Sequence, residues 1–330
     1  MTVNIKKSSA DCTIPCNLCG SRSIEIISLK DRKGDFLQTV ICKYCGLIWS
    51  DPRPDESKIR YFYSKLYRKE YKGRTRPKKK HIYRDAKEAM RRYLFFKDIL
   101  GTNDSVLDIG AGNGVFVYFL RQLDINAKGV EPDENHTKYA KTVLNVPVST
   151  LFSKDISKNE SFNIVTLHHV LEHMTDPAGE LKHIWSIIDE NGYLVVEVPN
   201  AEDIKQDPNN RYHKAHNYTF NPDTLIALGR KAGFKAIKCE TAPLNGNMSI
   251  IFQKHQSVNN CLAKLSGNYL KITKILNEHN NIRHFKSAVP YKKVIKNCFI
   301  AIKEQVKIRK YQSDKQIIDA VAGGEATPQL

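Results

Sequence analysis

The sequence contains no apolar run close to the ~18 residues that a membrane-spanning helix needs. Its first segment, MTVNIKKSSADC, also lacks the apolar core of a secretory signal peptide. A membrane-spanning or exported protein is therefore not expected, and we predict a cytoplasmic location in which cysteines stay reduced. Acidic residues are scarce as well, since 35 Asp and Glu stand against 52 Lys and Arg for a formal net charge of +17.

The excess of positive charge lies in two segments. Residues 65–97 contain fourteen Lys or Arg and three acids, and residues 257–330 contain thirteen and five. A basic surface attracts the phosphate groups of nucleic acids, nucleotide-sugars or lipid headgroups. The same composition is also typical of a solvent-exposed helix face. The positive charge alone therefore does not identify a binding partner.

Cysteine is concentrated at the N-terminus, where five of the eight lie in the first 45 residues. Two C-x-x-C-G motifs begin at Cys16 and Cys42, and the segments SIEIISL and FLQTVI between them alternate in the manner of hairpin strands. Four thiolates complete a tetrahedral zinc shell with no open position for catalysis. A pair of disulfides is the alternative, and a reducing compartment disfavours it. We predict a structural zinc ion held by Cys16, Cys19, Cys42 and Cys45.

The middle of the chain alternates predicted strands and helices. Strand patterns occur in VLDIG, NAKGVEP, FNIVTLHH and GYLVVEVPN. Helix patterns cover residues 84–100, 177–189 and 222–232, the second with Asp176 as N-cap and the pair Asn191-Gly192 as its stop. Such alternation predicts an α/β fold with a parallel sheet and helices on both of its faces.

A glycine-rich turn follows the first of these strands. Gly110, Gly112 and Gly114 would allow the backbone to approach a ligand closely at the start of a helix. The spacing departs from the dinucleotide fingerprint G-x-G-x-x-G at its third glycine. Glu131 ends the second strand, 23 residues after Asp108, and a carboxylate there can accept hydrogen bonds from both ribose hydroxyls. The combination predicts a nucleotide-like cofactor.

The segment DIGAGNG at residues 108–114 resembles motif I of class I S-adenosylmethionine-dependent methyltransferases. The resemblance covers residues 85–255, and it implies a Rossmann-like seven-stranded sheet whose last strand, MSIIFQK, runs antiparallel. FNIVTLHHVLEHMTDP followed by GYLVVEVPN resembles the ubiquinone-type O-methyltransferases. With its four-cysteine ribbon and the DPRP that follows, the chain is similar to bacterial zinc-ribbon methyltransferases found with sugar and surface-polysaccharide biosynthesis.

These features together predict four consecutive parts of the chain. Residues 1–55 would form the zinc ribbon, and residues 56–100 a basic helical linker or lid. Residues 101–256 would form the methyltransferase domain. Residues 257–330 match no known pattern and would form a basic, mainly helical C-terminal extension.

The resemblance also implies a set of contacts to S-adenosylmethionine. Asp108 would bind the methionine part and Glu131 the ribose, while Leu167 and His168 would flank the transferable methyl group. The remaining positions would pass beneath the cofactor or pack near its adenine: Gly110, Ala111, Gly112, Gly114, Pro132 and Leu151. Gly112 is the position at which a side chain is expected to do most harm.

The octet LHHVLEHM at residues 167–174 is rich in histidine. His169, Glu172 and His173 match the H-x-x-E-H pattern of some zinc peptidases, but the expected fold offers neither a third ligand nor a substrate cleft for that chemistry. At the start of a helix, the three side chains would share one face beside the cofactor. Three roles stay open: a general base, a divalent-metal site like the related E-x-x-E-H motif, or hydrogen bonds to the backbone.

A second histidine group lies in the segment NNRYHKAHNYTF. His216 resembles the histidine of the family's His-x-x-x-Phe stretch, so His173 and His216 are the predicted bases and His169 belongs to the same candidate site. Arg211, His213 and Lys214 could face an anionic acceptor, or could simply be polar residues of a surface loop.

The resemblance implies methyl transfer from S-adenosylmethionine. The predicted acceptor is a hydroxyl of a sugar, nucleotide-sugar or polysaccharide precursor, phosphorylated or not, with C-methylation of a keto-sugar as a variant. RNA methylation is an alternative suggested by the positive charge, although the sequence lacks an N-P-P-Y motif or a recognisable catalytic cysteine. A non-catalytic S-adenosylmethionine-binding scaffold is a further alternative, which the intact Asp108, glycine turn and Glu131 disfavour.

Overall fold

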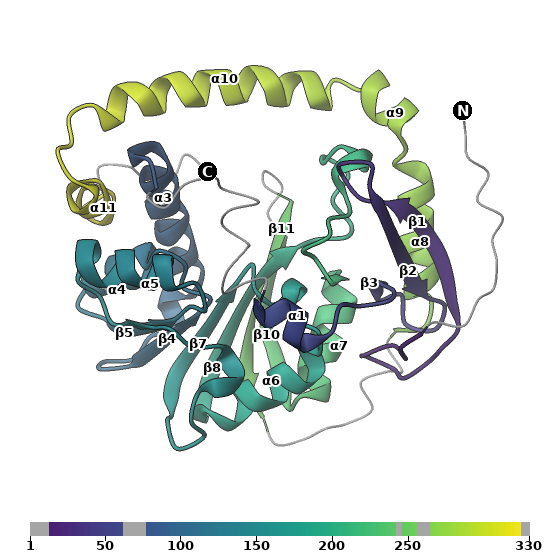
Figure 1. The fold of residues 1–330 in the computed structure, drawn as a ribbon, viewed down its shortest axis with the longest axis horizontal. Helices are drawn as coiled ribbons and strands as arrows, with labels where there is room; N and C mark the ends of the chain where they lie inside the picture. Colours follow the sequence, from purple (N-terminus) through teal and green to yellow (C-terminus); the bar gives the residue numbers. More distant parts are fainter. Residues whose placement is uncertain (1–12, 62–76, 242–245, 256–264, 325–330) are drawn as a thin grey trace. The chain divides into compact units, whose positions relative to one another are not determined.

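The computed structural model describes four ranges of the chain: residues 13–61, 77–241, 246–255 and 265–324 (Figure 1). Parts of both basic segments lie outside the described residues: 65–76, 257–264 and 325–330. No helix within the described ranges is long and apolar enough to cross a membrane.

The α/β fold contains a seven-stranded sheet with the strand order β10-β11-β8-β7-β4-β5-β6. Its strands are β4 (Ser105–Ile109), β5 (Asn126–Val130), β6 (Val148–Ser149), β7 (Phe162–His168), β8 (Ile188–Pro199), β10 (Phe234–Thr241) and β11 (Asn247–Lys254). β4 pairs in parallel with β5 and β7, while β10 and β11 pair antiparallel. Val106 and Ile164 are fully buried, as expected of parallel strands covered on both faces. The predicted fold class and the antiparallel last strand are confirmed.

The helices of the described residues come from both halves of the chain and are α1 (Glu56–Tyr61), α3 (Lys79–Phe96), α4 (Val115–Arg121), α5 (Glu134–Tyr139), α6 (Pro177–Ser186), α7 (Pro222–Lys231), α8 (Asn268–Glu278), α9 (Asn281–Lys286), α10 (Val289–Ile308) and α11 (Asp314–Ala322). Asn221 caps α7 as its N-cap, since its side chain accepts a hydrogen bond from the Thr224 amide. The three helices predicted in the middle of the chain are therefore present, with shifted ends.

One helix end differs from its prediction for a clear reason. α6 ends at Ser186, and β8 begins at Ile188. The Ile187 carbonyl accepts a hydrogen bond from the Phe162 amide at 3.0 Å, so the backbone has already entered the sheet. The predicted helix stop at Asn191-Gly192 therefore lies inside a strand.

The N-terminal ribbon is a four-stranded sheet with the order β1-β2-β3-β9. Its strands are β1 (Ile24–Lys30), β2 (Phe36–Cys42), β3 (Ile48–Ser50) and β9 (Tyr218–Thr219). β1 and β2 pair antiparallel, as the alternating pattern predicted. The edge strand β9 comes from far along the chain, where Tyr218 pairs with Trp49.

The described chain divides into two compact units that are interleaved in sequence. One comprises Met1–Asp55, His169–Trp185 and Val196–Lys292, and the other Glu56–His168, Ser186–Val195 and Lys293–Leu330. Segments of the two units alternate along the chain for two reasons. Strand β9 joins the N-terminal sheet, and the C-terminal helices are divided between the units. The four consecutive parts of the chain stay a prediction.

The C-terminal extension is helical, as predicted, and it contributes to both units. In the first unit, Ile272 of α8 packs in one buried cluster with Ile41 and Ile48 of the ribbon sheet. In the second unit, the Tyr118 hydroxyl of α4 donates to Asp319 of α11 at 2.9 Å. The tail therefore contributes to the cores of both units.

Candidate active site and metal centre

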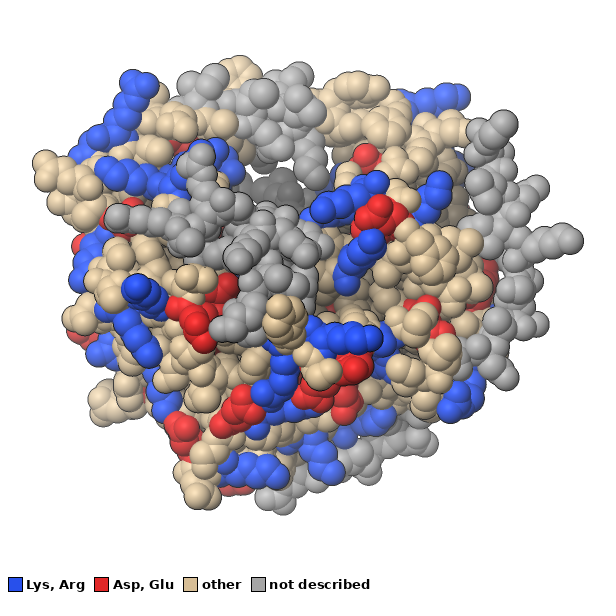
Figure 2. Space-filling view, in the orientation of Figure 1, with Lys and Arg blue, Asp and Glu red and all other residues tan. Residues whose placement is uncertain are grey.

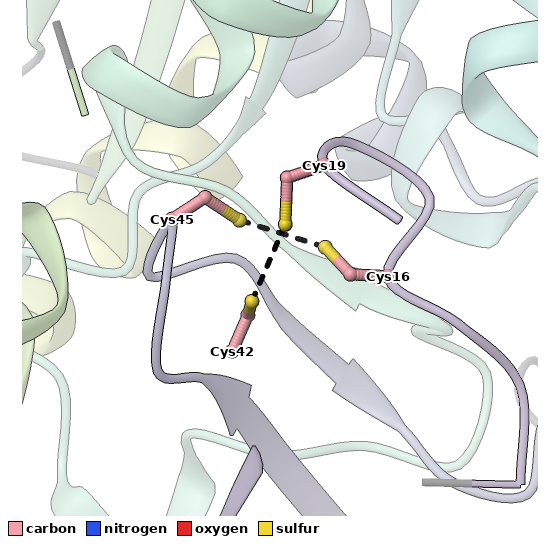
Figure 3. Close-up of side chains that lie close together, drawn as sticks. All are labelled: Cys16, Cys19, Cys42 and Cys45. Carbon is pink, nitrogen blue, oxygen red and sulfur yellow. Dashed lines mark hydrogen bonds between the residues drawn. The ribbon is translucent and has the colours of Figure 1, made fainter. Parts of the chain in front are cut away.

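Four cysteine side chains converge in the ribbon (Figure 3). Their sulfurs all lie within 4.8 Å of one another, with Cys16 3.5 Å from Cys45 and Cys19 3.5 Å from Cys42. Four sulfurs arranged tetrahedrally at about 2.3 Å from one zinc ion would lie about 3.8 Å apart, so the cluster has the size of a zinc site. Disulfide sulfurs are only about 2.05 Å apart, so these pairs are thiols. The donor set fits the predicted zinc ion.

The glycine turn after β4 has the backbone conformation of a loop that a ligand can approach. Gly110, Gly112 and Gly114 have φ values of +74°, +54° and +78°. The Gly112 amide donates to Glu131 Oε2 at 2.9 Å, and the Asp133 amide donates to Oε1 at 2.9 Å. Two amides thus hold the carboxylate beside the turn, and each oxygen keeps a lone pair for a ribose hydroxyl.

Two glycines of this turn have different surroundings. A Cβ on Gly114 would lie 2.8 Å from the Cβ of Ala140, whereas a Cβ on Gly112 would meet no described heavy atom within 4 Å. Gly114 is therefore required by packing, and Gly112 borders open space in which a ligand could lie. The sequence singled out Gly112, and the structure adds Gly114 as a position where a side chain would disturb the fold itself.

Asp108 lies at the end of β4 and is 4% exposed. The Thr166 hydroxyl donates to its Oδ1 at 2.7 Å, and Nδ1 of His168 lies 3.4 Å from the same oxygen. The His168 ring packs edge-on against Phe116, with ring centroids 4.9 Å apart. Both polar contacts are to Oδ1, which leaves Oδ2 able to accept a hydrogen bond from an amino group.

The other predicted contact residues differ in accessibility. Leu167 is fully buried and Ala111 is 7% exposed, so the backbone of each, rather than its side chain, could reach a ligand. Pro132 and Leu151 are partly exposed.

His136 borders Glu131 and was missed by sequence reasoning. Its Nδ1 lies 3.8 Å from Glu131 Oε1 and is buried without a hydrogen-bond partner among the described residues. A buried polar atom of this kind calls for a partner, which a bound hydroxyl could provide. No sequence motif indicates His136 as a site residue. It lies near Glu131 only because α5 starts shortly after the end of strand β5.

The histidine octet does not begin an α-helix, so this prediction is wrong. His169 has a left-handed backbone with φ +58°, Leu171–His173 form a short 3-10 helix, and α6 starts only at Pro177. The His169 amide donates to the Glu197 carbonyl at 2.8 Å, which ties this residue to β8. Because the backbone of the octet is not α-helical, its side chains do not share one helix face.

His169 lies between two buried carboxylates. Its Nδ1 is 3.3 Å from Glu172 Oε1 and its Nε2 is 3.4 Å from Glu197 Oε1, and both glutamates are 1% exposed. Burial lowers the pKa of His169, but hydrogen bonds and charge from Glu172 and then Glu197 outweigh it and raise the pKa to about 9. His169 is therefore protonated near neutral pH, where it offsets two negative charges and is unsuited to act as a base.

The stability of the protein should depend on pH through His169. Its raised pKa stabilises the folded state fully below the unfolded value of 6.5, and this contribution is lost as the pH rises through about 9. Since the side chain is 37% exposed, solvent screening reduces the contribution to about 1–2 kcal/mol. His169→Asn, which tolerates a positive φ, should flatten the fall in unfolding temperature across this pH window. An equally steep fall in the variant would contradict the assignment.

A second cluster joins Glu172, His173 and His216, whose ligand atoms lie within 4.8 Å of one another. Burial, and then the charge of His173, lower the pKa of His216 to about 3, so His216 is neutral near pH 7. Glu172 Oε2 is buried and has no hydrogen-bond partner in the described part of the chain. One carboxylate and two imidazoles could hold a divalent metal. The metal set expected from the sequence contained His169, and the structure gathers His216 in its place.

His173 is oriented by a backbone hydrogen bond. Its Nδ1 lies 2.6 Å from the Ala215 carbonyl oxygen, a contact that requires the proton on Nδ1. With the proton on Nδ1, Nε2 is the atom that can accept, and it lies 3.9 Å from Glu172 Oε1. A ring held in this way can take up a proton at Nε2, and the carboxylate would stabilise the resulting imidazolium.

Comparison with known proteins identifies the central part of the chain. Residues 80–238 match the model of a family described as a methyltransferase domain. The central part of the chain is thus similar to a methyltransferase domain. The matched range includes the glycine turn, Glu131, the octet and His216.

The chain is also similar to individual proteins. Over 100 residues the chain is 31% identical to the ubiquinone biosynthesis O-methyltransferase of Bradyrhizobium diazoefficiens, covering 29% of this chain and 40% of that protein. The chain thus spans about 40% of the length of this curated relative.

Two solved structures are similar to it as well. The 1,6-didemethyltoxoflavin-N1-methyltransferase of Burkholderia thailandensis has a TM-score of 0.49 at 15% identity, covering 64% of this chain and 96% of that one. A methyltransferase of Methanosarcina mazei has a TM-score of 0.42 at 16% identity, covering 50% and 99%.

Proposed function

We propose that the protein transfers a methyl group from S-adenosylmethionine to a hydroxyl oxygen of a sugar, nucleotide-sugar or polysaccharide precursor. The observation that supports methyl transfer is the Glu131 carboxylate, held by the Gly112 amide at 2.9 Å inside the range that matches a methyltransferase domain. The saccharide acceptor rests on the resemblance to zinc-ribbon methyltransferases. S-adenosylmethionine would supply a methyl group activated by its sulfonium. The residues of the chain would bind and orient it, with Glu131 accepting from the ribose hydroxyls and Asp108 from the amino group. Alignment of this kind can contribute ~7–11 kcal/mol to the rate.

A hydroxyl acceptor needs a base, and we propose His173 for this role. Its Nδ1 proton is engaged by the Ala215 carbonyl, which leaves Nε2 as the accepting atom. His216 is the second candidate, but its pKa of about 3 makes it a weak base near neutral pH. His169 would act as a structural counter-charge for Glu172.

The base assignment is tested by turnover of variants. His173→Ala should lower the rate by ~10²–10⁴ while the affinity for S-adenosylmethionine persists, because only proton transfer is removed. His216→Ala should have a smaller effect, and His81→Ala, an exposed position on α3, none. The assay would supply a panel of nucleotide-sugars and follow S-adenosylhomocysteine. Near-normal turnover in both His173→Ala and His216→Ala would leave alignment alone as the mechanism.

A metal ion is the second candidate for the same cluster, favoured by the unpartnered Glu172 Oε2. A divalent ion bound by Glu172, His173 and His216 would orient an acceptor oxygen and lower its pKa. Turnover measured with and without a chelator distinguishes the base mechanism from the metal mechanism. A base mechanism is insensitive to EDTA, whereas a metal mechanism loses activity and regains it with manganese or magnesium.

RNA remains an alternative acceptor, and the surface charge bears on it. On the face drawn in Figure 2, the Lys and Arg side chains of the described residues are interspersed with Asp and Glu. A nucleic-acid site would be expected to gather basic residues along one track. Methylation of a short RNA transcript, with no turnover of nucleotide-sugars, would overturn the saccharide proposal.

We further propose that the four cysteines hold a structural zinc ion and that the protein works in the cytoplasm. A reducing compartment keeps the thiols available as ligands. The closed four-sulfur set would stabilise the ribbon without taking part in the reaction.

A further inference from the structure

A cavity of about 880 Å³ lies in the first unit, apart from the residues discussed so far as catalytic. Its lining comes from the β1–β2 hairpin within residues 25–34, from the loop at residues 208–212, and from residues 273–281 at the junction of α8 and α9. Small-molecule sites have volumes of ~300–1,000 Å³, so this cavity could contain a ligand of the size of a nucleotide. It brings together three segments that are far apart in sequence.

The charged side chains of the cavity are mainly basic. Lys30, Arg32, Lys33 and Arg211 line it together with two acids, Glu25 and Asp31. Both acids are engaged locally. Asp31 Oδ1 accepts from the amides of Lys33 and Asp35 at 2.8 and 3.0 Å, which shapes the hairpin turn, and Glu25 accepts from the Tyr269 hydroxyl. The field inside the cavity therefore favours an anion.

Arg211 is positioned by a neutral partner. One of its terminal nitrogens donates to Nδ1 of His279 at 2.6 Å, so the His279 proton lies on Nε2, which donates to Nδ1 of His284 at 3.1 Å. Burial, and then the charge of Arg211, lower the pKa of His279 and keep it neutral. Arg211 is thus held in place by a neutral side chain, and within the described residues no ion pair joins it to a carboxylate. A guanidinium has five donors, so a donor that these contacts do not use could bind a ligand oxygen.

The floor of the cavity is apolar. Ile27, Tyr212 and Leu276 line the cavity and pack on the buried cluster beneath the ribbon sheet. Asn281 and Asn209 also line the cavity, and Asn281 donates to Asn209 at 2.9 Å, which joins α9 to the loop. An apolar floor with basic and amide groups around it suits a ring system that carries phosphate.

We propose that this cavity binds the diphosphate or phosphate group of a sugar nucleotide or sugar phosphate, with Arg211 as the principal anion contact and Tyr212 and Leu276 beneath a ring. Arg211 offers the planar, forked donors that match phosphate oxygens, and Arg32 and Lys33 add charge. The proposal concerns binding alone, and it holds whether or not the protein transfers a methyl group to the bound molecule.

The test is calorimetric titration of the full chain, without S-adenosylmethionine, using UDP-glucose, glucose 1-phosphate, pyrophosphate and glucose. Arg211→Gln should weaken UDP-glucose binding by roughly tenfold or more, because a charge-assisted hydrogen-bonding contact is lost. Arg211→Lys should recover only part of this loss, since Lys lacks the fork. Glucose alone should not bind, and pyrophosphate should bind more weakly than UDP-glucose because it does not cover the apolar floor.

The control is Lys274→Ala, which removes one positive charge from an exposed position of α8 outside the cavity lining. It should leave UDP-glucose affinity within about twofold of wild type, since a solvent-exposed charge outside the lining is screened by salt. S-adenosylmethionine affinity and unfolding temperature should be unchanged in Arg211→Gln, which separates this site from the proposed reaction. Equal affinity of wild type and Arg211→Gln, or no binding of any phosphorylated probe, would overturn the proposal.

Discussion

Glu131→Ala should weaken the binding of S-adenosylmethionine by about 10- to 100-fold. This is the loss of affinity expected when one or two hydrogen bonds to a charged group are removed. The carboxylate is held at 2.9 Å by the Gly112 and Asp133 amides, so it is already oriented before a ribose arrives. Calorimetric titration of the purified variant measures the loss. Glu278→Ala, which removes an exposed carboxylate from α8, is the matched control and should bind normally.

Gly112→Val should abolish the same binding while the protein still folds. The side chain would project into space that contains no described heavy atom within 4 Å, and the positive φ adds a strain of about 1–2 kcal/mol. Gly114→Val should instead lower the unfolding temperature strongly, because its side chain meets Ala140. Unchanged S-adenosylmethionine affinity in both Glu131→Ala and Gly112→Val would contradict the assigned cofactor site.

Replacing Cys16 and Cys42 together by alanine should remove zinc and destabilise the ribbon. The binding energy of a structural zinc ion is folding energy, and it reaches about 10–16 kcal/mol in isolated zinc-finger peptides. In this chain the ribbon also pairs with β9, so the loss should appear as a large fall in unfolding temperature and in soluble yield. Metal analysis should find one zinc per chain in the wild type and none in the variant.

Cys239→Ala is the matched control, since Cys239 is an exposed free cysteine of β10. It should keep its zinc and its unfolding temperature. Freshly purified wild-type protein without zinc, or a double variant that folds fully with zinc still bound, would refute the structural-zinc proposal.

The sequence determined the features that depend on neighbouring residues. The two cysteine motifs, the hairpin strands between them and the glycine turn all follow from short patterns, because tight turns and strand alternation are set within a few residues. The approach of Glu131 to Gly112 was also predictable, since adjacent parallel strands bring their ends to one edge of a sheet. The class of fold followed from these local signals.

The surroundings of the histidines were decided only by the tertiary structure. His169 has a charged partner in Glu197, His173 is oriented by the Ala215 carbonyl, and the ring of His216 lies against that of His173. The partner in each of these contacts lies outside the octet. The local pattern therefore suggested a helix and a metal-binding set of residues that the structure does not form.

The sequence offered Arg211 as a possible contact to an anion, but the cavity around it was decided only by the tertiary structure. Its partner His279 lies 68 residues away and becomes a neighbour only when α8 packs against the ribbon. A charge or a protonation state depends on distances of a few ångströms, which sequence spacing does not encode across separate elements. Local geometry is therefore readable from the sequence, whereas the electrostatics of each site are set by long-range packing.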